Sequence, residues 1–142
     1  MKAKFIYEFQ RGLTPKDALG IGEYYLIKEW IEYLKKTKQA LPWMEDYEIV
    51  DGKINSSIDV DISWCDLEIL PDYIKFGKVF GNFDCWFNSL EALKSSPDFV
   101  EGNYVVYYDF EEGLKINEEQ IRKYTEVKEE VRFSPSSRTK FK

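Results

Sequence analysis

Asp61 and Asp84 are the residues of this chain whose type and spacing could support a reaction. They occupy the same place in two copies of a pattern that recurs after 23 residues, which would put them on neighbouring strands about 5 Å apart. Two carboxylates at that distance repel each other, which raises the pKa of one of them and suits the pair to acid–base hydrolysis. That chemistry requires a cleft, whereas a sheet face is open. A carboxylate hydrolase is therefore one hypothesis, and it would require a closed pocket around the pair.

The chain lacks several other groups on which catalysis commonly depends. It contains no histidine, the commonest general base and zinc ligand. Gly20-Ile21-Gly22 lacks the later glycine of a phosphate-binding loop. We interpret Cys65 and Cys85 as small reduced core residues rather than a disulfide or a metal site. We therefore expect a protein that is not an enzyme and that uses no cofactor and no metal.

The elements that would position the two aspartates are repeats. An apolar pair separated by one residue recurs after 23 and then 21 residues, in the pattern of a leucine-rich repeat. The pairs are Val60 and Ile62, Phe83 and Cys85, and Tyr104 and Val106. We expect strands over residues 59–64, 82–87 and 103–108 in one parallel sheet. Asn88 would bond neighbouring backbone groups, while Leu90 and Leu93 would turn the chain back into the core.

Alternation along these strands separates an inner from an outer face. The inner side chains would be Val60, Ile62, Trp64, Phe83, Cys85, Phe87, Tyr104, Val106 and Tyr108. The outer side chains would form one row of Asp61, Asp84 and Val105 and a second row of Ser63, Trp86 and Tyr107. Exposed aromatic residues are typical of interface hot spots, so we predict that these six residues bind a partner. The alternative is that the N-terminal helix or the C-terminal tail covers Trp86 and Tyr107.

The fold class that follows is α+β, a short leucine-rich-repeat-like stack of about three parallel strands with caps. Residues 1–46 would form an N-terminal helical cap, with a helix opening at Thr14-Pro15, interrupted at Gly20 and Gly22, and continuing over residues 23–36. Residues 47–112 would form the stack, which begins with a hairpin turning at Asp51-Gly52. Residues 113–142 would form a second helix, from Asn117 to about residue 130, that covers the far end, followed by a basic tail.

Charge indicates the kind of partner. The 142 residues carry 20 basic and 26 acidic side chains, a net charge of −6. Residues 59–112 contain twelve acids and three lysines, a net charge of −9. The last twelve residues carry four basic side chains and no acid, so the remainder is −10 (16 basic against 26 acidic). A basic protein surface is favoured as partner, whereas direct contact with nucleic acid or a membrane is not. We expect a cytoplasmic protein, since no signal peptide or membrane span is evident.

Residues 47–109 resemble the small leucine-rich-repeat-like proteins of tailed bacteriophages and prophages. The resemblance is carried by segments 57–61 (SIDVD), 70–76 (LPDYIKF), 81–85 (GNFDC) and 88–93 (NSLEAL). It implies a parallel repeat stack, a phage origin and action in the host cytoplasm, and it implies no catalytic residues. The chain departs from longer members in having about three copies and in losing the asparagine from the last.

The leading hypothesis is a non-enzymatic, phage-encoded protein-binding module that occludes a host protein, such as a defence component. The alternative is an acidic nucleic-acid mimic, in which Asp61, Asp84 and neighbouring acids stand in for phosphates and inhibit a DNA- or RNA-binding protein. The two differ in salt dependence, because a mimic would lose affinity steeply as salt rises. The sequence leaves the partner and the oligomeric state open.

Overall fold

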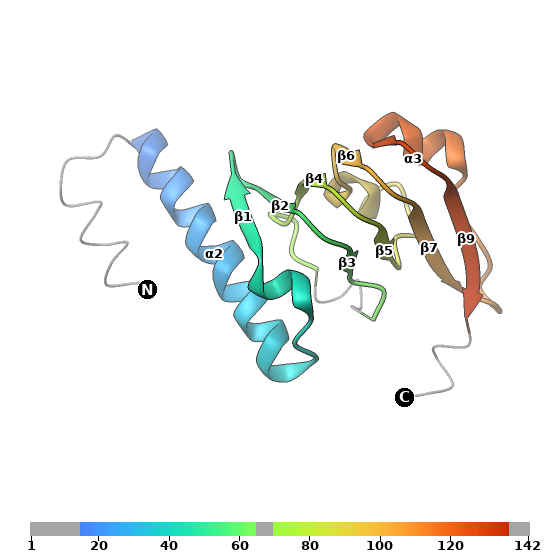
Figure 1. Ribbon diagram of the computed structural model, residues 1–142, viewed down its shortest axis with the longest axis horizontal. Coiled ribbons are helices and arrows are strands. Elements are labelled where there is room, and N and C mark those ends of the chain that lie inside the picture. The colour runs from blue at the N-terminus through green and yellow to red at the C-terminus, as the bar shows by residue number, and fades with distance from the viewer. Residues whose placement is uncertain (1–14, 65–69, 137–142) are drawn as a thin grey trace.

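The computed structural model describes residues 15–64 and 70–136 of the chain. Within these residues the fold is α+β, with the helices α2 (Pro15–Thr37) and α3 (Glu118–Tyr124) and two largely parallel sheets (Figure 1). The first sheet runs in the order β1 (Tyr47–Val50), β2 (Lys53–Ser56), β4 (Phe76–Val79), β6 (Phe99–Val100), β8 (Glu126–Val127). The second sheet runs in the order β3 (Val60–Asp61), β5 (Phe83–Cys85), β7 (Tyr104–Asp109), β9 (Val131–Ser136).

From β2 onward the chain alternates between the two sheets, and each strand pairs in parallel with its equivalent in the next turn of chain. We call each such turn a coil; it consists of a first-sheet strand, a bend, a second-sheet strand and a return leg. Val60 pairs with Phe83, Phe83 with Tyr104, and Tyr104 with Val131. The expected parallel register of the first three is confirmed. The parallel strands of the first sheet and the fourth strand of the second sheet are not expected from the sequence.

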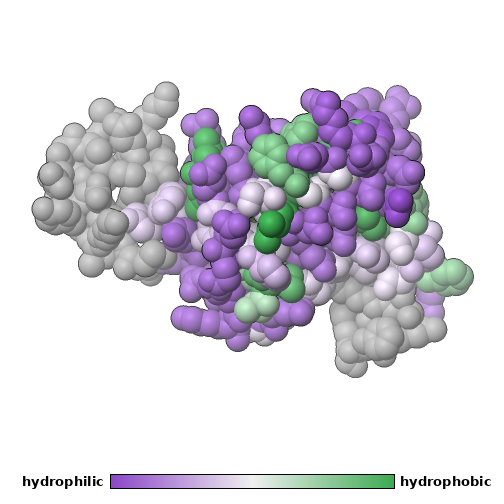
Figure 2. Space-filling view, in the orientation of Figure 1, coloured by the Kyte–Doolittle hydropathy of each residue, from purple (hydrophilic) through white to green (hydrophobic). Residues whose placement is uncertain are grey.

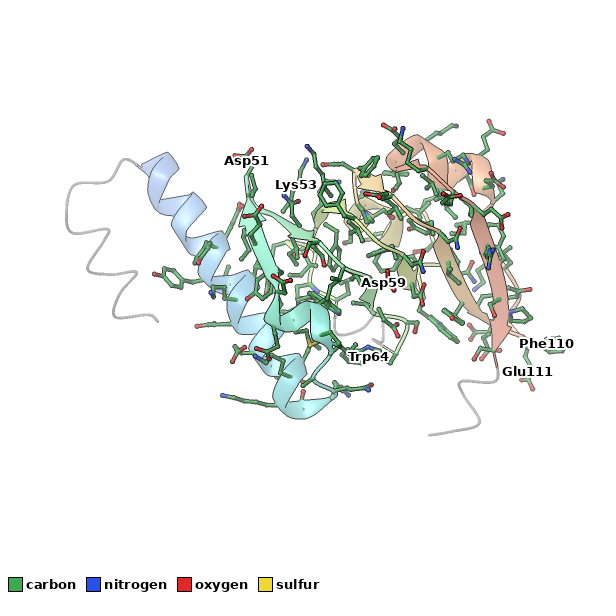
Figure 3. The ribbon with its side chains drawn as sticks, in the orientation of Figure 1. Asp51, Lys53, Asp59, Trp64, Phe110 and Glu111 are labelled. Atoms are coloured by element: carbon green, nitrogen blue, oxygen red, sulfur yellow. The ribbon has the colours of Figure 1, made fainter. Side chains whose placement is uncertain are left out.

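Polar side chains of successive coils support the bend between the sheets. Asp59 Oδ1 accepts the backbone N–H of Asn82 (2.8 Å), and Asn82 Oδ1 accepts that of Asn103 (2.8 Å). Asn103 Oδ1 in turn accepts the N–H of Glu130 (3.0 Å). Asp59 lies at the bend between β2 and β3 (Figure 3). These side chains satisfy amides that a bent strand would leave unpaired, which holds the coils in register.

Asn88 performs the same task in the return legs, as expected. Its Nδ2 donates to the carbonyl of Gly113 (2.9 Å), and its Oδ1 accepts the N–H of Lys115 (2.6 Å). Leu93 is fully buried in the short helix η3 (Ala92–Ser95), but Leu90 is 53% exposed, so its expected core role is wrong. η3 is a single tight turn, which directs Leu93 inward and leaves Leu90 outside.

The core lies between the two sheets and the return legs. Aromatic rings make contacts through it, with centroid distances of 5.8 Å for Trp43–Phe76, 5.2 Å for Phe76–Phe83 and 5.3 Å for Phe83–Tyr104. Val60, Ile62, Phe83, Cys85, Phe87, Tyr104 and Val106 point inward and are buried, as predicted. Trp64 and Tyr108 were expected inside but are only half-buried, because Trp64 lies three residues beyond the end of β3 and the inward alternation of β7 is lost at Tyr108. Cys65, also expected in the core, lies outside the described residues.

The first end of the stack carries the expected hairpin. β1 and β2 pair antiparallel around Asp51 (φ 53°) and Gly52 (φ 75°), the two left-handed residues that a tight hairpin turn requires. Helix α2 lies beside β1 at this end (Figure 1). It buries Ile27, Ile31 and Leu34. In contrast to the expectation, α2 runs without interruption through Gly20 and Gly22, since the cost of each glycine in a helix is only about 1 kcal/mol.

The C-terminal helix is shorter than expected and lies elsewhere. Its capping box is confirmed, because Asn117 accepts the N–H of Gln120 and the Gln120 side chain accepts that of Asn117 (2.9 Å each). The helix ends at Tyr124, and the chain continues as β8 and β9. α3 contacts β8 and η3, so it lies along the return legs and does not cover the far end. The apolar spacing of Val127 and Val131 fits a helix, but both residues pair as strands of the fourth coil.

Among the described residues, no helix combines the length and the apolar composition needed to cross a membrane.

Candidate binding face

Four of the six candidate residues, Asp61, Asp84, Val105 and Tyr107, are strand residues of the second sheet that alternate with buried ones. Asp61 is paired with Asp84, and Asp84 with Val105, so the first expected row is formed in register. Ser63 and Trp86 follow Asp61 and Asp84 by two residues, beyond the ends of β3 and β5. We call the surface made by Asp61, Ser63, Asp84, Trp86, Val105 and Tyr107 the acid–aromatic face.

The two aspartates of this face have different surroundings. Asp61 Oδ1 accepts both the backbone N–H (2.9 Å) and the hydroxyl (2.6 Å) of Ser63, which fixes its position. Burial, followed by the charges of Asp61 and Asp59, raises the pKa of Asp84 to about 6. In the described part of the chain, neither Asp61 nor Asp84 has an ion-pair partner within 4.0 Å. The face therefore carries negative charge that no described lysine or arginine compensates by direct contact.

The aromatic residues of the face are half-buried, not fully exposed. Burial, followed by the charges of Asp84 and Asp61, raises the pKa of Tyr107. Helix α2 lies beside β1 at the first end of the stack, away from β5 and β7 (Figure 1). The tail from residue 137 onward lies outside the described residues. The rings are therefore partly accessible, and within the described part α2 does not cover them.

The structure extends the face by a residue that sequence reasoning missed. Val105 pairs with Arg132 of β9, and Tyr107 with Ser134, so the row of two acids and a valine ends in a cation. Arg132 bonds Glu130 through Nε (2.9 Å) and is exposed. A strand signal is present here, since apolar and polar residues alternate over Val131, Arg132, Phe133 and Ser134. The preceding residues have the apolar spacing of a helix, so the sequence alone predicts the end of a helix and the start of a tail at this point.

The position of two cavities of the described structure bears on whether the aspartate pair could do chemistry. A cavity of about 430 Å³ lies between the return legs at residues 70–72 and 89–95, and another of about 260 Å³ lies at residues 46–48, 55–57 and 80. Neither is lined by Asp61 or Asp84. Among the described residues, no three histidine, cysteine or acidic side chains are placed to hold a metal ion. Neither cavity therefore provides the closed pocket that hydrolysis by the aspartate pair would require. The chemistry open to the pair at the surface is the binding of a cationic group.

Hydrophobic surface elsewhere is dispersed. Figure 2 shows one side of the molecule as mainly hydrophilic, with small separate hydrophobic areas. Among the residues whose burial is described, the most exposed large apolar side chain is Phe110, at 75%, which projects with Glu111 from the end of β7 (Figure 3). A large apolar docking patch is not evident on this side.

Comparison of the chain with protein-family models, with curated proteins and with solved structures finds no match to any of them. The resemblance of residues 47–109 to leucine-rich-repeat-like phage proteins therefore stays a prediction from the sequence.

Proposed function

We propose that the protein is a non-enzymatic binding module whose acid–aromatic face captures a basic surface of another protein. The observation that carries this proposal is the pairing of Asp61 with Asp84 on adjacent strands beside Tyr107. Carboxylates crowded together in this way gain most from a partner that brings positive charge, because it relieves their mutual repulsion.

The aromatic rings indicate which cation fits. An arginine or lysine side chain that reaches the carboxylates would lie against Trp86 or Tyr107, where the face of an aromatic ring attracts a cation. Arginine fits best, since its planar fork can bond two carboxylate oxygens while it stacks on a ring. The half-burial of both rings limits the side-chain entropy that binding would cost.

The acidic row is too short to favour nucleic-acid mimicry. After Asp61 and Asp84 the row continues with Val105 and then with Arg132, which carries the opposite charge. A duplex presents an uninterrupted series of phosphates along its axis. The face therefore suits a local cationic contact better than imitation of a phosphate backbone.

The experiment that tests this function is affinity capture from host lysate with the tagged chain and with a Trp86→Ala/Tyr107→Ala variant. We expect the variant to retain its circular dichroism spectrum and melting temperature and to lose most of the captured partner. Removal of such ring contacts typically costs about 2 kcal/mol or more, which is over tenfold in affinity. Phe110→Ala is the matched control, because it removes an exposed ring that is outside the face. Unchanged capture by the double variant would show that the binding site lies elsewhere.

We further propose that the stack belongs to the leucine-rich-repeat-like class, that the chain is phage-encoded and that it acts in the host cytoplasm by occluding a host protein. Support for the class comes from the strand spacing of 23 and 21 residues and from the position of Asn88, which bonds the next coil. The presence of two strands in each coil distinguishes the arrangement from a simple single-sheet repeat. A defence component is the kind of host protein that this origin suggests.

A further inference from the structure

The segment that follows β9 is basic, and its charges are regularly spaced. Residues 137–142 read SRTKFK, in which Arg138, Lys140 and Lys142 are cations and no residue is an acid. Because the cations occupy every second position, an extended chain would place them on one side, about 6.6 Å apart. A segment with this pattern is complementary in charge to carboxylates that lie in a row.

The segment begins near the aromatic part of the acid–aromatic face. β3, β5, β7 and β9 pair in parallel, so their carboxyl ends lie at the same end of the second sheet. Trp86 follows the end of β5, and Tyr107 lies near the end of β7. Ser136, the last residue of β9, pairs with Asp109 and accepts the N–H of Phe110 through its carbonyl (3.2 Å). The chain therefore leaves β9 at the end of the sheet where the two rings lie.

The face is within reach of the segment. Tyr107 lies one strand across and two residues back from Ser136, which is about 8 Å between Cα atoms. Two extended residues cover about 7 Å, so Arg138 can reach the ring of Tyr107. Asp84 lies two strands across and four residues back, about 16 Å away. Four extended residues cover about 13 Å, and the side chain of Lys140 supplies the rest.

Other places near the start of the segment attract cations less strongly. Glu111 and Glu112 follow β7 and are exposed, and ion pairs between solvated side chains contribute little to stability. The outer edge of β9 is unpaired among the described strands, but the backbone groups of an edge do not select for cations. Asp61 and Asp84 are half-buried neighbours that no described cation contacts, so a nearby cation relieves their repulsion.

We propose that residues 137–142 fold back over the acid–aromatic face, so that Arg138 lies against Tyr107 and Lys140 lies between Asp61 and Asp84. A segment joined to the face by a few residues has an effective concentration on the order of millimolar there, so a basic partner must displace it. The docking requires only the face and the segment, whereas the competition with a partner rests on the proposed function.

The competition has an expected size. If the segment occupies the face in about 70–90% of the molecules, the face is free in about 10–30% of them. The apparent affinity for a partner then falls about three- to tenfold relative to a chain whose segment cannot dock. Salt should release the segment, because the ion pairs that hold it are partly exposed and are screened.

The test of docking compares the NMR signals of the full chain with those of two variants. The first replaces the three cations of the segment and is called the neutral-tail variant; it is Arg138→Gln/Lys140→Gln/Lys142→Gln. The second is the matched control, which removes the same charge from exposed positions outside the face; it is Lys36→Gln/Lys38→Gln/Lys123→Gln. Both should keep the circular dichroism spectrum of the unmodified chain, because all six positions lie outside the strands and the core.

In the neutral-tail variant, we expect shifts of the amide signals of Asp61, Asp84 and Tyr107 and of the indole signal of Trp86. The control variant should leave these signals in place. The shifts should also disappear when the segment is neutralised in an Asp61→Asn/Asp84→Asn chain. Unchanged signals of the face, or changes confined to the exposed acids after β7, would overturn the docking. Shifts that grow with protein concentration would show that a second copy supplies the segment, and would also overturn it.

The test of competition is titration of a tetra-arginine peptide into the unmodified chain and the neutral-tail variant. The variant should bind the peptide about three- to tenfold more tightly. Equal affinities would overturn the competition, while binding of the peptide to both chains would leave the proposed function in place. If the signals of the face shift but the peptide binds neither chain, the docking stands and capture of a basic partner by this face is refuted.

Discussion

Among the residues of the acid–aromatic face, Asp84 has the most strongly shifted pKa. Its side chain is partly buried and lies near Asp61 and Asp59, so the charged form is disfavoured and the pKa rises above its usual range, to about 6. Asp61 meets the same neighbour but is held by two hydrogen bonds from Ser63. The charged form of Asp84 is thus destabilised, which is an electrostatic condition that favours the binding of a cation.

Asp84→Asn should stabilise the protein in a pH-dependent way. Between pH 4 and 6 the folded chain holds a proton that the unfolded chain releases, so the free energy of unfolding falls as pH rises through this window. Above it, the variant should be more stable by about 1 kcal/mol, after allowance for solvent screening of a partly exposed group. Urea denaturation of both proteins from pH 4 to 8 measures the difference. A difference that is equal at both limits would contradict the assignment.

Asp98→Asn is the control of opposite sign. Burial alone would raise the pKa of Asp98, but the hydrogen bond from Lys53 (2.8 Å) and the charge of Lys75 lower it. A carboxyl with a lowered pKa contributes stability at neutral pH that is lost as pH falls through its folded-state value. This variant should therefore be less stable than the unmodified chain at pH 7 and approach it in acid.

At the scale of elements, the bend between the sheets is held by side chains that lie over glycines of the next coil. A Cβ on Gly81 would lie 2.6 Å from the backbone nitrogen of Asp59, and one on Gly102 would lie 2.9 Å from the carbonyl oxygen of Gly81. No side chain fits at either place, because the backbones themselves approach too closely. At Gly77, a Cβ within 3 Å would meet only the side chain of Asn55, whose Oδ1 accepts the N–H of Lys78 (2.8 Å).

This difference predicts the outcome of two double-mutant cycles. Gly77→Ala should cost about 1–3 kcal/mol by overpacking, and Asn55→Ala about 1 kcal/mol by loss of its hydrogen bond. Because Asn55→Ala also removes the obstruction, the double variant should cost less than the sum by about 1 kcal/mol. Gly81→Ala with Asp59→Ala should show little such relief, since backbone atoms remain in the way. Chemical denaturation of the six variants measures both couplings, and equal couplings would disprove this account of the bend.

At the scale of the whole molecule, the outer face of the second sheet has acids at one end and a cation at the other. The acids Asp59, Asp61 and Asp84 lie on the first two coils, whereas Arg132 lies on the last. The net charge of −6 would favour encounter with the basic partner that we propose.

The salt dependence of partner binding follows from this distribution. With two carboxylates in register and two rings beside them, affinity should fall only modestly between about 50 and 200 mM salt. A nucleic-acid mimic that engages 6–10 cations would lose about a thousandfold or more over that range. Titration of the captured partner at several salt concentrations distinguishes the two, and a steep loss would favour mimicry over the aromatic-centred contact.

The repeat pattern was sufficient to predict the second sheet's register, because side chains alternate with a period of two and any slip would expose Val60, Phe83 or Tyr104. For the same reason it placed Asp61, Asp84 and Val105 in one row. The Asp51-Gly52 hairpin was also predictable, since its turn depends on two adjacent residues alone. These features depend on local chemistry or on a repeated spacing, both of which a single sequence displays.

Features that depend on distant neighbours were decided by the tertiary structure. β4, β6 and β8 are two to four residues long and are strands only because the preceding coil supplies their hydrogen-bond partners. Val127 and Val131 satisfy a helical spacing equally well, and it is pairing with β6 and β7 that makes them strands. The raised pKa of Asp84 and the unpaired edge of β9 likewise arise from what packs nearby. Amino-acid type determined which side chains could share a face, whereas the hydrogen bonds and burial of the folded chain determined where that face ends.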